Sequence, residues 1–250
     1  MDLFEGTGRQ CLVNFLLCGT IVISALTSAM AQVITPVSLR DPTLPFAEGG
    51  SGDSSAPILS PDGRFVVFAS TAGNLALVNG APIIPASTVR QNVYRHDRST
   101  RTTLLVSVNG AGTGGGNADS WPAGISADGR YILFESLADD LVSGDTNSVG
   151  DIFLRDLDAG ATVLVSVGRD GPANGESRDA VMTPDARWVA FSSAASNLAA
   201  GDTNGIPDVF VRDVRTGATW LVSVNAASTA PAMLMGGSHS PRIKIGRAHV

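Results

Sequence analysis

The chain has 250 residues, of which 44% are hydrophobic and 16% are charged, with 28 glycines and 13 prolines. This composition supports the packed core of one or two small domains, and it lacks the low hydrophobicity and high net charge of a disordered protein. The formal net charge of −6 argues against a broad surface for nucleic acid.

The N-terminal segment has the features of an export signal. Residues 11–31 are mostly apolar and end in Ala29-Met30-Ala31, which fits a signal-peptide cleavage site. We therefore expect residues 1–31 to be removed and the protein to be periplasmic or extracellular, with no membrane insertion after cleavage. The stretch is also long enough for an uncleaved N-terminal anchor. Both cysteines, Cys11 and Cys18, lie inside it, so the expected mature chain has no thiol.

The rest of the chain is organised by a repeat. A turn containing Asp, followed by a hydrophobic run, occurs at 60–70, 126–136 and 183–193. Each copy continues with a second apolar block that ends in Asp, at 93–97, 152–156 and 209–213. A third block, Leu-Val-Ser-Val, follows at 105–108, 164–167 and 221–224, and a short apolar element precedes each turn.

The four segments of each copy have the composition of β-strands. They are short, rich in β-branched and aromatic residues, and separated by Gly, Asp, Asn and Pro. An Asp-Gly pair between two such runs is typical of a hairpin. Four strands per repeat of this length predict the blade of a β-propeller. In the third copy Ala186 replaces the turn glycine, and we expect that turn to differ because alanine is strained at positive φ.

The run Ser-Pro-Asp-Gly-Arg-Phe-Val-Val-Phe at 60–68, with the blocks that follow it, resembles the TolB-type (WD40-like) β-propeller repeat. The resemblance implies an all-β fold of four-stranded antiparallel blades at 54–119, 120–176 and 177–237. It implies no single function, because propellers of this kind have many roles. TolB also carries an α/β domain ahead of its propeller, and we expect no such domain in the stretch before residue 54.

The two ends suggest an incomplete ring. Residues 32–53 are expected to be a linker containing a lone strand near 37–39, which in such propellers closes the ring by joining the last blade. A fourth copy starts at Ser238 and breaks off at 243. Residues 244–250 resemble the translation of a sequencing adaptor, and we expect them to be a non-native tail. The sequence thus predicts about three blades and a closing strand of a larger propeller.

Two loops between the second and third strands carry oxygen side chains at calcium-loop spacing. Their predicted metal ligands are Asp145, Asn147 and Asp151 in one loop, and Asp202, Asn204 and Asp208 in the other. The third carboxylate and the distal bidentate Glu of a calcium loop are missing. The alternative is an Asx-rich turn whose side chains cap their own backbone. Calcium is therefore the one cofactor that the sequence suggests.

Other polar residues fit structural roles. Asp62, Asp128 and Asp185 in the turns, and Asp97, Asp156 and Asp213 at the strand ends, occur once per copy; Arg64, Arg130 and Arg187 suit them as partners. His96 replaces an Arg of the other copies, which suggests an exposed position. Trp188 shares its position with Phe65 and Tyr131, which favours packing between blades. The chain has no Gly-x-Ser-x-Gly pentapeptide and no Cys/His cluster, so we expect no catalytic residues.

These observations predict an exported, non-catalytic propeller that binds a protein or glycan partner. Two alternatives remain open. The chain could be the propeller portion of a larger secreted hydrolase, peptidase or lyase, or a structural surface protein with tandem propellers.

Overall fold

The structure is a computed structural model of the chain. It describes residues 49–78, 81–82, 84, 89–202, 204–224 and 241. The chain divides into two units, Met1–Thr35 and Pro36–Val250, and every described residue belongs to the second unit. The signal segment, the strand near 37–39 and the tail at 244–250 lie outside the described residues, as does Ser238, where the fourth repeat starts.

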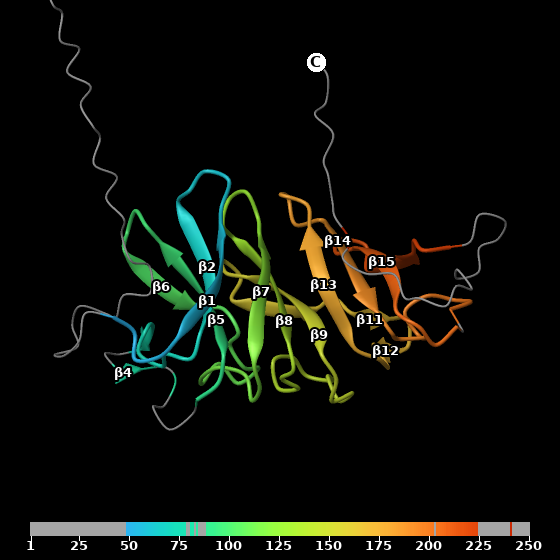
Figure 1. The fold of residues 1–250 in the computed structure, drawn as a ribbon, viewed down its shortest axis with the longest axis horizontal. Coiled ribbons are helices and arrows are strands. Elements are labelled where there is room, and N and C mark those ends of the chain that lie inside the picture. The colour runs from blue at the N-terminus through green and yellow to red at the C-terminus, as the bar shows by residue number, and fades with distance from the viewer. Residues whose placement is uncertain are drawn as a thin grey trace, which may run out of the picture. The chain divides into compact units, whose positions relative to one another are not determined.

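The described part of the chain is all-β and contains three four-stranded antiparallel sheets (Figure 1). In the first sheet the order is β1 (Ser54–Leu59), β2 (Phe65–Ser70), β5 (Asn92–Asp97) and β6 (Thr102–Leu105). In the second it is β7 (Ser120–Ile125), β8 (Tyr131–Ser136), β9 (Asp151–Asp156) and β10 (Ala161–Leu164). In the third it is β13 (Ser177–Met182), β14 (Trp188–Ser193), β15 (Asp208–Asp213) and β16 (Ala218–Leu221).

In each sheet the four strands lie side by side in the order in which they occur along the chain. This antiparallel meander is the topology of a propeller blade. The all-β fold class is therefore confirmed, and the three blades form no closed ring among the described residues. Two small hairpins accompany the blades, β3 (Leu77–Val78) with β4 (Ala81–Pro82) and β11 (Val167–Gly168) with β12 (Gly171–Pro172). None of the described residues belongs to a helix long and apolar enough to cross a bilayer.

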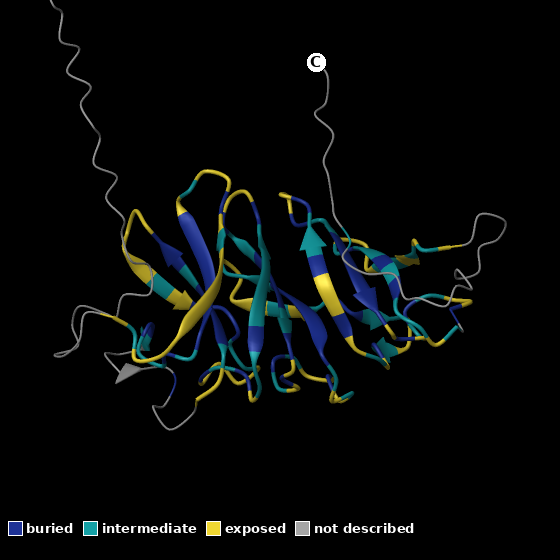
Figure 2. Cartoon of the chain, in the orientation of Figure 1, coloured by how far each residue is buried: buried dark blue, intermediate teal, exposed yellow. Residues whose placement is uncertain are grey.

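The second strand of each blade is apolar on both sides because both faces of the blade are covered. Along β2, Val66 and Phe68 join one core cluster, whereas Val67 between them joins the next. Along β8, Phe134 and Leu133 divide between two clusters in the same way. Successive strand residues point to opposite faces, so an uninterrupted hydrophobic run builds two cores at once. Figure 2 shows these buried strands in dark blue.

Neighbouring blades pack through the first strand of the later one: β7 contacts β1, β2 and β5, and β13 contacts β7, β8 and β9. At the first of these interfaces the ring of Phe65 lies against Gly129, so closely that a Cβ at Gly129 would overlap the ring. Arg95 stacks on the same ring at 4.6 Å and donates to the carbonyl of Gly129 at 2.9 Å. The turn of the second blade is therefore part of the interface.

The turn of the third blade does not differ from the others, contrary to the sequence expectation. Ala186 adopts φ 52°, and its N–H donates to the carbonyl of Thr183 at 2.8 Å. Gly63 makes the same bond to Ser60, with φ 72°. The strand pairing on both sides determines the turn, and the alanine accepts a left-handed backbone that costs about 1–2 kcal/mol.

Candidate functional site

The repeated aspartates of the turns have structural roles. Asp128 accepts hydrogen bonds from the Ser126 hydroxyl at 2.5 Å and from the backbone N–H of Arg130 at 3.0 Å, which closes the turn. Asp62 and Asp185 repeat this arrangement with Ser60 and Thr183. These bonds lower the pKa of all three carboxyls, with the side-chain hydrogen bond as the largest cause.

The strand-end aspartates bind the arginines of the turns. Arg130 donates from Nε and Nη2 to the two oxygens of Asp156, at 2.8 and 2.6 Å. Arg64 binds Asp97 in the same way, and Arg187 binds one oxygen of Asp213. One such pair in every blade ties the turn to the third strand, as the sequence suggested.

Two of the predicted ligands of the second blade, Asp145 and Asn147, lie in the loop that precedes β9, and Asp151 is the first residue of that strand. Asp151 is fully buried and accepts a hydrogen bond from the Ser166 hydroxyl at 2.5 Å. Asn147 donates from Nδ2 to Asp151 at 2.5 Å and to the carbonyl of Ala173 at 2.8 Å, while its Oδ1 accepts from the N–H of Val149. The alternative of an Asx-type turn therefore describes most of these contacts.

Asp145 is the exception in this loop. Its side chain is buried, at 5% exposure, and its Oδ1 is buried without a hydrogen-bond partner. Burial raises the pKa of Asp145, and the backbone N–H of Asn147 partly offsets that rise. Burial also raises the pKa of Asp151 to about 6, and the charge of Asp145 adds to the increase.

The third blade repeats the loop. Asn204 donates from Nδ2 to Asp208 at 2.7 Å, and Ser223 donates to the same carboxylate at 2.5 Å. Burial and the charge of Asp208 raise the pKa of Asp202. In the first blade Asn92 occupies the position of Asp151, and its Oδ1 accepts a hydrogen bond from the Ser107 hydroxyl at 3.1 Å. The bond between the serine and the strand therefore recurs there with a neutral acceptor. Nowhere in the described ranges do three His, Cys, Asp or Glu side chains converge as metal ligands.

A second candidate site, which sequence reasoning missed, lies on the first strands of the blades. Each of these strands has a β-bulge, between Ser55 and Ile58 in β1, between Pro122 and Gly124 in β7, and between Arg178 and Val181 in β13. The serine before each bulge is constant, and its hydroxyl bonds to a serine at the end of the next strand. The bulge thus recurs as a structural element.

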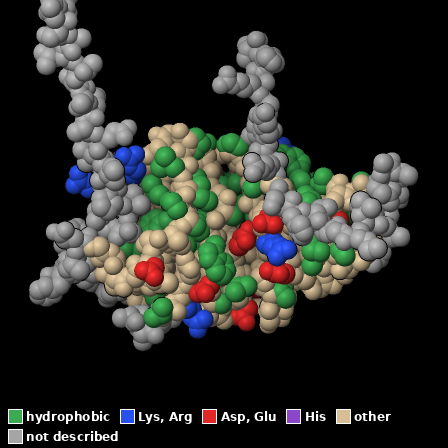
Figure 3. Space-filling view, in the orientation of Figure 1, with side chains coloured by type: hydrophobic (Ala, Val, Ile, Leu, Met, Phe, Trp, Pro, Cys, Tyr) green, Lys and Arg blue, Asp and Glu red, His purple; other side chains and the backbone are tan. Residues whose placement is uncertain are grey.

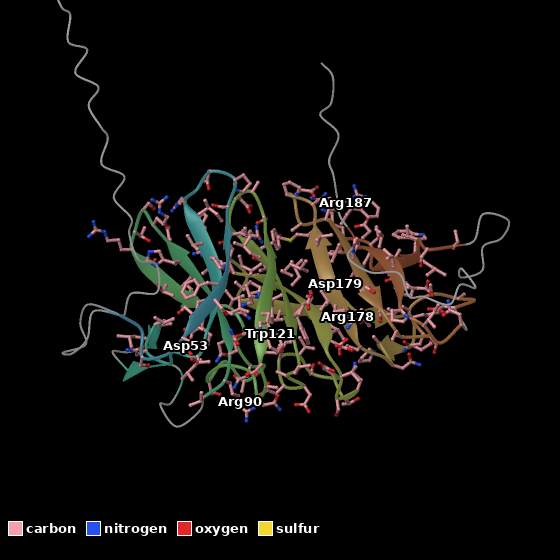
Figure 4. The ribbon with its side chains drawn as sticks, in the orientation of Figure 1. Asp53, Arg90, Trp121, Arg178, Asp179 and Arg187 are labelled. Carbon is pink, nitrogen blue, oxygen red and sulfur yellow. The ribbon has the colours of Figure 1, made fainter. Side chains whose placement is uncertain are left out.

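The residues at the bulges differ from blade to blade. They are Ser55-Ala56 in the first, Trp121-Pro122 in the second and Arg178-Asp179 in the third. Arg178 and Asp179 are exposed, Trp121 is half-buried, and Asp179 has φ 56°. Figure 4 labels Trp121 on β7 beside Arg178 and Asp179 on β13, and Figure 3 shows acidic and basic side chains gathered over this part of the surface. We call these three residues the inner-strand patch.

Glu135 bonds to the strand that carries two residues of the patch. It lies on β8 opposite Trp121 and accepts a hydrogen bond from the backbone N–H of Ala180 at 3.0 Å, across the boundary between the second and third blades. Its burial raises the pKa of the carboxyl, an effect that the bond from Ala180 partly offsets. The other blades have Ala69 and Ser192 at this position. The lack of repetition at Glu135 and at the bulges is the sequence signal that could have identified the patch.

One expectation about a single residue needs correction. His96 is buried at 6% exposure, not exposed, and its Nδ1 lies 3.0 Å from the Thr103 hydroxyl. Phe65 packs between blades as expected, and Trp188 lies in the last described blade against Trp220 of that blade, with ring centroids 5.9 Å apart and planes tilted by 41°. The expected packing of Trp188 against a following blade lies outside the described residues. The preference for an exposed position at His96 came from its arginine equivalents, Arg155 and Arg212, which are themselves half-buried and donate to the Thr162 and Thr219 hydroxyls.

Comparison with known proteins identifies similar propellers. No family model matches the chain. It is 32% identical over 122 residues to a probable dipeptidyl-peptidase 5 from Aspergillus niger, covering 45% of this chain and 16% of that protein. Similar solved structures include TolB from Agrobacterium tumefaciens (18% identity, 67% of this chain, 45% of that one, TM-score 0.42). The propeller domain of the Trilobed protease from Pyrococcus furiosus is another, with 14% identity over 67% of this chain and 41% of that one and a TM-score of 0.42. The chain thus spans less than half the length of each.

Proposed function

We propose that the chain is an exported, non-catalytic propeller module that binds a polar protein or glycan partner through its inner-strand patch. The observation that carries the proposal is the broken repeat at the bulges. Turn, strand-end and core residues recur in every blade, as structural roles require. The exposed residues at the bulges do not recur, and they hold an indole, a guanidinium and a carboxylate on neighbouring strands.

The chemistry of the patch suits a partner rich in hydrogen-bonding groups. Trp121 offers a flat apolar surface that is already half-buried, so little conformational entropy is lost when a partner covers it. Arg178 Nε and Asp179 Oδ2 are 4.0 Å apart and both side chains are exposed, so the ion pair is weak. Each side chain can therefore bind a polar group of a partner. The bulge geometry and the Glu135–Ala180 bond keep the backbone beneath them rigid.

The test is binding to a glycan array and a displayed peptide library, with the variants Trp121→Ala and Arg178→Ala. Arg169→Ala is the matched control, because Arg169 is exposed on the turn between β11 and β12, outside the strands that carry the patch. We expect a ligand whose affinity falls at least about tenfold in both patch variants, as for an interface anchor. A ligand that binds both patch variants as well as wild type would refute the proposal.

A second candidate is the propeller portion of a larger peptidase. The 32% identity with the probable dipeptidyl-peptidase 5 favours it. Sequencing the gene on both sides of this coding region tests it, because a peptidase of the serine class needs a nucleophile elbow that the 250 residues lack. A downstream domain with Gly-x-Ser-x-Gly would make this the better description. In that case the patch becomes a surface for substrate entry or docking.

A further inference from the structure

The third blade exposes an apolar side that the other two blades bury. Val106 in the first blade and Val165 in the second are buried, because each belongs to a core cluster that includes residues of the following blade. Val222 occupies the same backbone position in the third blade, where its N–H donates to the carbonyl of Val209 at 2.8 Å, but it is 52% exposed. Val224 is 41% exposed. We call Val209, Val222 and Val224 the trailing face.

The first strand of the first blade is exposed where its equivalents are covered. Leu59, the last residue of β1, is 57% exposed, whereas Ile125 and Met182 pack against clusters that include residues of the preceding blade. A Cβ at Gly124 on β7 would lie 3.4 Å from Met182 Cγ, so the first strands of the second and third blades are in close contact. We call Ser54 and Leu59, both exposed on β1, the leading face.

A recurring hydrogen bond shows how a leading side meets a trailing side within the chain. A serine at the start of the first strand donates its N–H, at 2.8 Å, to the carbonyl that precedes the third strand of the preceding blade; the pairs are Ser120 with Gln91 and Ser177 with Gly150. Both of these serines are buried. In the same series, the exposed Ser54 carries the equivalent N–H on the first blade, and Pro207 carries the equivalent carbonyl on the third. The two faces therefore hold the two halves of one contact between blades.

We propose that the trailing face of one copy of this chain binds the leading face of a second copy, so that two chains close one six-bladed ring. Each copy carries one face of each kind, and a two-fold axis then pairs both faces of both copies. Three blades from each chain give six, which lies within the range of four to eight at which propellers close. The contact buries Leu59 and Val222 and joins Ser54 to Pro207 as in the other blades. Burial of exposed apolar side chains supplies the driving force. The proposal is independent of the inner-strand patch.

The experiment is sedimentation equilibrium of the full chain from about 1 to 100 µM. We expect wild type to be a dimer with no larger species. Val222→Asp on the trailing face and Leu59→Asp on the leading face should each weaken dimerisation at least about 100-fold, because the dimer would bury the new charge at both of its interfaces. Val163→Asp is the matched control. It makes the same change on the fourth strand of the middle blade, where Val163 is 46% exposed, and it should dimerise as wild type does.

A mixture of the two face variants separates loss of binding from loss of folding. Equal amounts of Val222→Asp and Leu59→Asp should form dimers that neither variant forms alone, because the unchanged trailing face of Leu59→Asp meets the unchanged leading face of Val222→Asp. These dimers should be weaker than wild type, since only one of their two interfaces is intact.

Four outcomes would each overturn the proposal. They are a wild type that stays monomeric over the whole concentration range, open assemblies larger than a dimer, a Val163→Asp variant that loses the dimer, and a mixture of the two face variants that stays monomeric. The first outcome would mean that another part of the chain, or nothing, covers the two faces.

Discussion

Glu135 on the second blade accepts a hydrogen bond from the backbone N–H of Ala180 on the third, with the two atoms 3.0 Å apart. The bond joins residues 45 positions apart in the sequence and fixes the bulge beneath Arg178 and Asp179. Among the described residues, no other charged side chain of the second blade bonds to the first strand of the third.

The bond gives a prediction about stability. Glu135→Leu leaves the N–H of Ala180 without its acceptor, and Ala180 is buried, so unfolding free energy should fall by about 1–3 kcal/mol. Glu135→Gln keeps an acceptor oxygen and should lose clearly less. Urea denaturation of the two variants and wild type measures the difference. Equal losses for the leucine and glutamine variants would show that the hydrogen bond contributes nothing.

Gly63 and Gly129 form a natural pair for measuring the packing between blades. Both turns have φ 72°, so alanine at either costs about 1 kcal/mol in backbone strain. A Cβ at Gly63 meets open space apart from an Arg98 nitrogen at 3.9 Å, whereas one at Gly129 meets the Phe65 ring. We expect Gly129→Ala to cost about 1–3 kcal/mol more than Gly63→Ala in chemical denaturation. Similar costs would mean that the Phe65 ring moves aside freely.

The serines of the Leu-Val-Ser-Val block should contribute different amounts to the free energy of unfolding. Ser166 donates to the buried carboxylate of Asp151, and Ser107 donates to the neutral amide oxygen of Asn92. Removing a hydrogen bond to a charged group costs about 1.5–3 kcal/mol, against about 1 kcal/mol for a neutral one. Ser166→Ala should therefore destabilise the protein more than Ser107→Ala in urea titrations carried out in EDTA. Equal or reversed losses would contradict a charged acceptor at Asp151.

The arginine–aspartate pairs predict acid sensitivity. Arg130 lowers the pKa of Asp156 to about 2, below its unfolded value near 3.9, so the ionised carboxylate is favoured in the folded state. A depressed pKa contributes stability that is complete above the unfolded pKa and is lost as the pH falls through the folded one. The Tm difference between wild type and Asp156→Asn should thus be constant above about pH 5 and shrink toward pH 2.

Asp170→Asn, on the exposed turn between β11 and β12, is the control for that experiment. It removes an exposed carboxylate that joins none of the described ion pairs, so the variant should melt as wild type does. A difference between wild type and Asp156→Asn that is independent of pH would assign the effect of Asp156 to packing and not to its charge.

Much of the fold was predictable because its signals are local. The hydrophobic run along 65–70 and its copies, the Asp-containing turns and the recurring blocks depend on neighbours within a few residues, and they predicted the strands that form. The Arg130–Asp156 pair was also accessible, since both residues recur once per copy. The turn at Ala186 was misjudged because strand pairing on both sides overrides the preference of one residue.

The amino-acid sequence by itself determined that the chain builds repeated four-stranded blades, because hydrophobic period and turn chemistry act within each repeat. Only the tertiary structure decided which polar groups are buried without a partner and which meet across two blades. Asp145 and Asp202 occupy equivalent positions, yet of the two only Asp145 lines a cavity and has a buried side-chain oxygen without a partner. Trp121, Arg178 and Glu135 come together because β13 packs against β7 and β8. Burial and contact between blades depend on neighbours far away in sequence, which no local pattern specifies.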